Sequence, residues 1–127
     1  MNKEEINNKL KELNIEDMIW IIYIGIIIIS YYSNNLERNY FLNKNIKSKE
    51  EYRKIMILIF SILILVYFYF LNDSYNGIKN LQLSDNKEKV DLTYLSFIAS
   101  LLIFISGIIF LYIAVKDEDL NVELAFN

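Results

Sequence analysis

Three uncharged runs of hydrophobic residues alternate with four charged segments along the chain. The runs extend over residues 18–32, 55–71 and 92–115. A buried β-strand is also apolar on both faces, but strands usually end within about 4 to 8 residues, so these longer runs favour helices. A soluble domain scatters its apolar residues at helical or strand spacing, whereas here they are concentrated in blocks. We therefore predict an all-α integral membrane protein with three transmembrane helices.

The predicted spans differ in length, and they cover about residues 18–34, 53–72 and 90–115. The apolar centre of the first reaches only about 22 Å of a hydrocarbon core near 30 Å, so we expect its helix to continue outward. A cleaved signal peptide is the alternative. However, the preceding segment has more acids than bases, and Ser33-Asn34-Asn35 is a poor cleavage site. We favour a retained span.

Polar residues next to the runs predict where the helices begin and end. The predicted N-caps are Asn14, Ser48 in a capping box with Glu51, and Asp85 with Glu88 three residues on. The turn formers Asn72-Asp73-Ser74 and Asn76-Gly77 directly follow the second run. We expect the second helix to end there.

The N-terminal segment contains an apolar stripe before the first span. Ile6, Leu10 and Leu13 have i, i+4, i+7 spacing among charged and amide residues. This spacing suits a short amphipathic helix that lies in the membrane interface. A plain solvated leader is the alternative.

The C-terminal tail, residues 116–127, begins with the acidic residues Asp117, Glu118 and Asp119. Apolar residues then alternate strictly with polar or small ones, at Leu120, Val122, Leu124 and Phe126. An extended tail of this pattern would present an apolar face suited to adding a strand to a partner protein. A disordered acidic end is the alternative that the charges favour.

The distribution of basic residues predicts the orientation in the membrane. Segments 1–17, 33–54, 72–91 and 116–127 carry three, six, three and one Lys or Arg. The segment 33–54 is densest in basic residues and is the only one of the four with a net positive charge, so we place it in the cytoplasm. The N-terminus is then outside the cell and the C-terminus is cytoplasmic.

The sequence lacks the groups that most catalytic and transport sites need. It has no histidine and no cysteine, and none of the three runs contains an ionisable Asp, Glu, Lys or Arg. Carriers and proton relays normally keep such a residue inside the membrane. The net charge of −3 gives no basic surface for nucleic acid. We expect no enzyme activity, no cofactor, no metal ion and no nucleic-acid partner.

The serines of the runs have a structural interpretation. Each hydroxyl is expected to donate to a backbone carbonyl one turn earlier or to a neighbouring helix, rather than to act in catalysis. These serines are Ser30, Ser61, Ser96, Ser100 and Ser106.

A seam of seven positions, five of them small residues, runs along the third span. Its members recur every three or four residues, and they are Thr93, Ser96, Ser100, Ile103, Gly107, Phe110 and Ala114. In lipid, close packing along small residues drives helix association. The seam therefore predicts a helix contact, either between copies of the chain or with the chain's own first or second span through Gly25 or Ser61.

Two functional classes remain open for a multi-pass protein of the cell membrane. The size, the three spans and the lack of charge within them resemble three-span holins, which implies pore formation by a homo-oligomer. The acidic tail departs from the basic tail typical of that family. The first class is thus a self-associating, pore-forming or membrane-perturbing protein. The second is a non-catalytic accessory subunit or scaffold that docks on a larger membrane complex.

Overall fold

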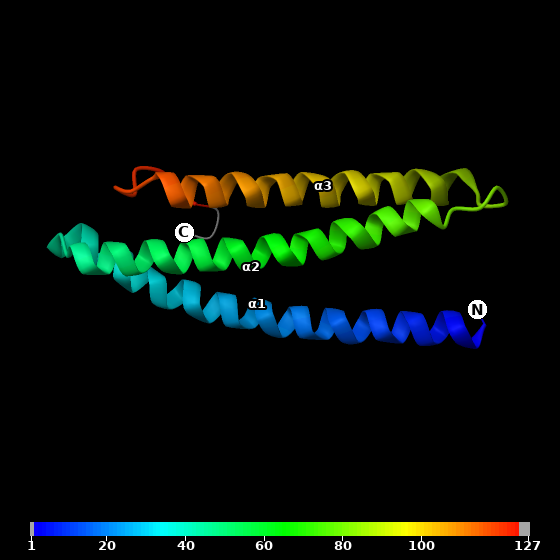
Figure 1. Ribbon diagram of the computed structural model, residues 1–127, viewed down its shortest axis with the longest axis horizontal. Coiled ribbons are helices and arrows are strands. Elements are labelled where there is room, and N and C mark those ends of the chain that lie inside the picture. The colour runs from blue at the N-terminus through cyan, green and yellow to red at the C-terminus, as the bar shows by residue number, and fades with distance from the viewer. Residues whose placement is uncertain (1, 125–127) are drawn as a thin grey trace. The chain divides into compact units, whose positions relative to one another are not determined.

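Every regular element of the chain is a helix in the computed structural model, which describes residues 2–124 (Figure 1). The helices are α1 (Lys3–Asn43), α2 (Ile46–Lys79) and α3 (Lys87–Lys116). Each is long and apolar enough to cross a membrane. Even α3, with 30 residues, reaches about 45 Å, which exceeds a hydrocarbon core near 30 Å. The prediction of three long apolar helices is confirmed.

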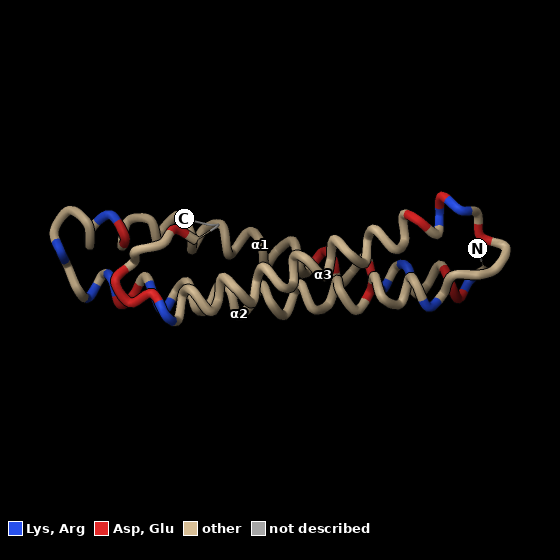
Figure 2. Tube along the Cα trace, turned by 90° about the horizontal axis from the view of Figure 1, so that it is seen from above, with Lys and Arg blue, Asp and Glu red and all other residues tan. Residues whose placement is uncertain are grey.

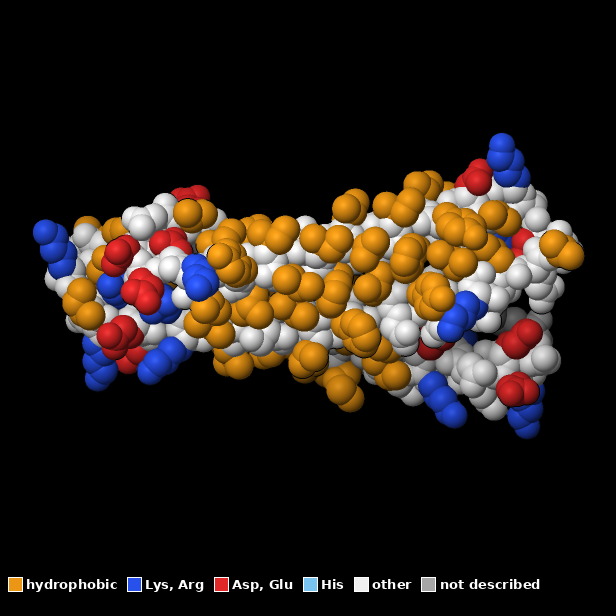
Figure 3. Space-filling view, turned by 45° about the horizontal axis from the view of Figure 1, so that its top comes forward, with side chains coloured by type: hydrophobic (Ala, Val, Ile, Leu, Met, Phe, Trp, Pro, Cys, Tyr) orange, Lys and Arg blue, Asp and Glu red, His pale blue; other side chains and the backbone are white. Residues whose placement is uncertain are grey.

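The helices belong to two compact units. Residues 1–49 form the first, which contains α1 and the first residues of α2, and residues 50–127 form the second, which contains the rest of α2 and α3. The Cα trace in Figure 2 shows Lys, Arg, Asp and Glu towards the ends of α2 and α3 and none along their centres. In Figure 3, hydrophobic side chains cover the corresponding middle stretch of the surface. Charge and apolar surface are thus separated along each helix.

The N-cap of α1 lies twelve residues before the cap that the sequence suggested. Asn2 is the N-cap: its Oδ1 accepts from the Glu5 amide at 2.8 Å, and Glu5 Oε2 accepts from the Asn2 amide at 3.2 Å. This capping box satisfies two amides that the helix leaves unpaired. The prediction of Asn14 as a cap is wrong, since α1 runs through it. The amphipathic residues 3–17 are helical, but they continue directly into the first span.

The connection between α1 and α2 is two residues long. Lys44 adopts a left-handed conformation, with φ of 51°, and ends α1. Asn45 then caps α2, because its Oδ1 accepts from the Ser48 amide at 3.0 Å. Ser48 is therefore already helical, and the predicted capping box with Glu51 is wrong. The Ser48 hydroxyl instead accepts from Asn39 Nδ2 at 2.8 Å, which ties the start of α2 to α1.

Two other helix boundaries differ from the prediction. The turn formers at 72–77 do not end α2, which continues to Lys79. Contacts with α3 outweigh their weak helix preference: the Tyr75 ring lies 5.9 Å from that of Phe97, and a Cβ at Gly77 would lie 3.6 Å from Thr93 Cγ2. Asn86 rather than Asp85 caps α3, with its side chain accepting from the Lys89 amide at 2.8 Å.

The connection at residues 80–86 is held by Asp85. Its Oδ2 accepts from the Gln82 amide at 2.7 Å and its Oδ1 from Lys89 Nζ at 3.0 Å. The hydrogen bond from the Gln82 backbone, followed by that from Lys89, lowers the pKa of the Asp85 carboxyl below its ordinary value. Asp85 thus braces the turn between α2 and α3 in its charged form.

Candidate functional site: the α2–α3 pair

Aromatic side chains join α2 and α3 along most of their length. In the second unit the two helices run antiparallel, side by side (Figure 1). Ring centroids lie 5.5 Å apart for Phe60 and Phe110, in a stacked arrangement, and 5.9 Å apart for Phe68 and Phe104. A third pair, Tyr75 and Phe97, has ring centroids 5.9 Å apart. The pair is therefore a continuous interface rather than a local contact.

Gly107 allows the closest packing recorded at a glycine of this interface. A Cβ added to it would lie 3.0 Å from Tyr67 Cδ2 and 3.4 Å from Ile64 Cγ1, both on α2. A distance of 3.0 Å leaves no room for a side chain unless the Tyr67 ring moves. The hydrogen of Gly107 is what lets that ring lie against the backbone of α3.

The structure brings only part of the predicted seam of α3 into this interface. Gly107 and Ala114 are buried, and Phe110 stacks on Phe60. Thr93 and Ser100 are half-buried, whereas Ser96 and Ile103 are exposed. Of the seam positions nearest the C-terminal end of α3, Gly107 and Phe110 thus pack against α2, and Ala114 is buried within the chain.

Two serines of the apolar runs donate to carbonyls one turn earlier, as expected. The distance is 2.7 Å from Ser61 Oγ to the Ile57 oxygen and 2.8 Å from Ser106 Oγ to the Leu102 oxygen. Ser30 Oγ is buried and has no hydrogen-bond partner among the described residues. The satisfied hydroxyls are thus held by the helix itself, which is how a serine is tolerated in an apolar helix.

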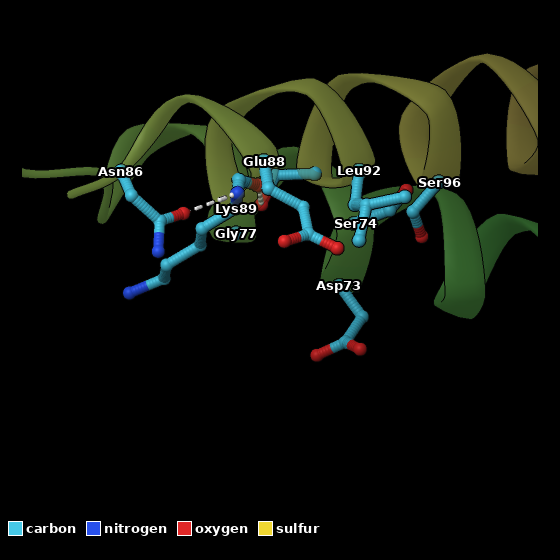
Figure 4. Close-up of a pocket in the computed structure, with 9 residues that line it drawn as sticks. Asp73, Ser74, Gly77, Asn86, Glu88, Lys89, Leu92 and Ser96 are labelled. Carbon is cyan, nitrogen blue, oxygen red and sulfur yellow. Dashed lines mark hydrogen bonds between the residues drawn. The ribbon is translucent and has the colours of Figure 1, made fainter.

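A shallow pocket of about 580 Å³ lies where the C-terminal end of α2 meets the start of α3. Figure 4 shows the carboxylate side chains of Asp73 and Glu88 coming from the two different helices. The other lining residues are Ser74, Gly77, Asn86, Lys89, Leu92, Thr93 and Ser96. The pocket depends on the extension of α2 beyond residue 72, which is why sequence reasoning missed it.

The pocket offers mostly hydrogen-bond acceptors. Ser74 Oγ donates to the Leu71 carbonyl at 2.9 Å and Thr93 Oγ1 to the Lys89 carbonyl at 2.7 Å, so both hydroxyl oxygens keep free lone pairs. Asp73 and Glu88 add two carboxylates. Within residues 2–124, no three His, Cys, Asp or Glu are close enough together to hold a metal ion.

At the opposite end of the pair, Arg53 holds the last turn of α3. Its Nη2 donates to the Val115 carbonyl at 3.0 Å. The last carbonyls of a helix have no partner within it and carry a partial negative charge, so a cation there is favourable. The charge of Arg53 suggested cytoplasmic placement from the sequence, but nothing there indicated this contact between helices.

The described part of the C-terminal tail forms turns rather than an extended strand. Asp117 accepts from the amides of Asn121 at 3.0 Å and Val122 at 2.8 Å, and Leu120 has a positive φ of 56°. The strict alternation of Leu120, Val122 and Leu124 therefore does not give one apolar face, because local hydrogen bonds to Asp117 curl the backbone. Phe126 lies outside the described residues.

Comparison with known proteins gives no relative. No family model matches the chain, and neither curated proteins nor solved structures provide a match.

Proposed function

We propose that the chain is a multi-pass protein of the cell membrane that associates with copies of itself and permeabilises or perturbs the bilayer, without catalysing a reaction. The observation that carries the membrane placement is the separation of charge along three helices that are each long enough to cross a bilayer. A soluble protein rarely leaves so much contiguous apolar surface exposed. In lipid the same surface is favourable.

Self-association is supported by the small number of helices and by their exposed apolar side chains. Large hydrophobic side chains remain exposed along the centres of α1 and α3. The buried members of the small-residue seam, Gly107 and Ala114, pack within the chain, so contacts between copies use outer helix faces. The absence of ionisable residues from the apolar runs argues against a carrier.

Membrane insertion and assembly are tested separately. The protein should stay with membranes in alkaline carbonate and be released by detergent; release by carbonate alone would overturn the membrane placement. In mild detergent the purified chain should have the mass of a discrete homo-oligomer, and in liposomes it should release an entrapped dye. A monomer that leaves liposomes intact would contradict the pore-forming role.

The second candidate is an accessory subunit or scaffold of a larger membrane complex, and the C-terminal tail favours it. Asp117 gives residues 117–122 a defined turn next to the end of α3, and Val122 is exposed there. An exposed valine on an ordered turn offers a partner a small apolar contact. A chain that is monomeric alone, and gains thermal stability only when co-purified with a membrane partner, would support this role.

A further inference from the structure

Three basic residues border the apolar runs of α2 and α3 at one end of this helix pair. Arg53 and Lys54 directly precede the run 55–71, and Lys116 directly follows the run 92–115. All three belong to the second compact unit, so their arrangement relative to one another does not depend on the position of α1. We call them the basic border.

A hydrogen bond places the basic border at one level along the two helices. Arg53 Nη2 donates to the Val115 carbonyl at 3.0 Å, and Lys116 is the next residue of α3. Lys54 follows Arg53 in α2, at a rise of about 1.5 Å. The three cations therefore form one group on two helices, at the level where the apolar runs of both helices end.

No carboxylate neutralises the basic border. Among residues 2–124, no ion pair includes any of its three members. Glu50 and Glu51 come about one helical turn before Lys54, further from the apolar run. The Asp117 carboxylate accepts from two backbone amides of the tail instead. The basic border thus keeps its positive charge for an anion from outside the chain.

Lys116 lies back along α3, toward the apolar run. Its Nζ is 6.0 Å from the centroid of the Tyr112 ring, one turn earlier in the helix. Side chains of a helix tilt toward its N-terminus, and at this end of α3 that is the direction of the apolar centre. Tyrosine is typical of the level at which lipid headgroups meet the hydrocarbon core. The contact with Tyr112 therefore keeps the ammonium group of Lys116 at headgroup depth.

The opposite end of the α2–α3 pair has the reverse charge next to its apolar runs. Asp73 follows the run of α2 by two residues, and Asp91 directly precedes the run of α3. Of the basic residues at that end, Lys89 is bonded to a carboxylate of the connection, and Lys79 and Lys87 lie further from the runs. An anionic headgroup would meet carboxylates at that end and cations at the basic border.

We propose that the basic border binds the anionic headgroup of a phospholipid in the leaflet around it. This rests on the membrane placement proposed above and is independent of self-association. Arg53 has guanidinium donors besides the one that bonds Val115, and the two lysines add compact charges. Binding requires only that lipid reaches one side of the helix pair at this level, and a single neighbouring helix cannot cover both sides. Each basic residue near an anionic membrane surface increases affinity about fivefold.

The lipid that stays bound to the full chain tests the proposal. The protein is inserted into vesicles of phosphatidylglycerol and phosphatidylcholine in equal amounts and purified in mild detergent, and the ratio of the two bound lipids is measured. The unsubstituted chain should retain phosphatidylglycerol in several-fold excess. Lys54→Gln combined with Lys116→Gln should reduce this excess several-fold, because two ammonium groups are removed from the basic border.

Lys79→Gln combined with Lys87→Gln is the matched control. It removes one lysine from each of the same two helices, at the opposite end of the pair, and should leave the excess of phosphatidylglycerol unchanged. Equal retention of the two lipids by the unsubstituted chain would overturn the proposal, whether or not the variants fold. An equal loss in both double variants would also overturn it, because the binding then follows the net charge rather than the basic border.

Two further measurements identify the source of the anion and separate this inference from the proposed function. The midpoint of thermal unfolding should be higher in lipid discs of phosphatidylglycerol than in discs of phosphatidylcholine, and inorganic phosphate added to the latter should not raise it. A rise with phosphate alone would overturn the lipid headgroup as the occupant. Release of the chain from membranes by alkaline carbonate overturns both the membrane placement and this proposal. Retention without preference for phosphatidylglycerol overturns only the role of the basic border.

Discussion

Gly107 shows how a single residue determines the packing of two helices. Replacing it with leucine forces side-chain atoms into the space of the Tyr67 ring, 3.0 Å from the position of its Cβ. Overpacking of this kind typically costs about 1–3 kcal/mol. We expect Gly107→Leu to lower the midpoint of thermal unfolding in detergent, followed by circular dichroism.

Gly25 provides the matched control for this prediction. A Cβ added there has nothing within 4 Å, so Gly25→Leu should leave stability unchanged or raise it through better helix propensity. Adding Ser100→Leu to Gly107→Leu should destabilise the monomer further, because both positions lie at least partly within the chain's own interface. If the two glycine variants unfold at the same temperature, the contact with Tyr67 does not hold the helices together.

Asp85 makes the turn between α2 and α3 dependent on pH. Its pKa is lowered in the folded chain, chiefly by the Gln82 amide and then by Lys89, so its stabilising contribution is present above the ordinary pKa near 4. It is lost as the pH falls through the lowered value. By NMR, the Gln82 amide shift should stay constant from about pH 7 to pH 5 and change below about pH 4.

Variants of Asp85 and Lys89 test whether the Asp85 carboxyl causes this acid transition. Asp85→Asn should abolish the acid transition of the Gln82 amide, and Lys89→Gln should move the transition to a higher pH, because it removes a hydrogen bond and a positive charge from the carboxylate. An acid transition that survives in Asp85→Asn would show that another group controls the turn.

At the scale of the element, the two ends of α3 are stabilised by different hydrogen bonds. Its first turn is capped within its own segment by Asn86, whereas its last turn accepts a hydrogen bond from Arg53 of α2. Arg53→Met retains the aliphatic stem but removes the donor, at a cost of about 1 kcal/mol. We expect faster amide hydrogen exchange at residues 115–117 in this variant.

Lys54→Met is the control for Arg53→Met, since the neighbouring Lys54 is exposed. It removes the same charge from α2, so a purely electrostatic effect on α3 would appear in both variants. Equal exchange rates in the two variants would contradict a specific role for the Arg53 hydrogen bond.

At the scale of the whole molecule, the proposed membrane placement, with one crossing for each helix, puts the two helix connections on opposite sides of the membrane. The excess of basic residues in 33–54 predicts a cytoplasmic connection between α1 and α2. In intact cells, cysteine at Lys44 should be shielded from an impermeant thiol reagent, and cysteine at Lys79 should be labelled. The reverse labelling pattern would invert the orientation.

The number and identity of the helices could be predicted from the sequence because they depend on local composition. A run of uncharged apolar residues too long for a strand favours a helix wherever it lies, and residues 18–32, 55–71 and 92–115 all lie within helices. The back-bonded hydroxyls of Ser61 and Ser106 are equally local, since donor and acceptor are one turn apart.

Helix ends could not be predicted in the same way, because several polar residues compete for each cap at nearly equal energy. Asn45 and Asn86 outcompete Ser48 and Asp85, and α2 continues past its predicted turn because contacts such as Tyr75 with Phe97 stabilise the additional residues. A cap contributes about 1 kcal/mol, so one tertiary contact can move a boundary by several residues.

The sequence by itself determined three helices of membrane-spanning length, their uncharged centres and the lack of the usual catalytic side chains. Only the tertiary structure decided which helix faces pack within the chain: Gly107 lies against Tyr67, Arg53 reaches Val115, and Asp73 and Glu88 line one pocket. The physical reason is that an uninterrupted apolar run predicts that a helix prefers lipid, but it does not show which face of that helix packs against another helix. Packing between two helices depends on where their backbones approach each other closely. Such an approach involves residues that are far apart in the sequence.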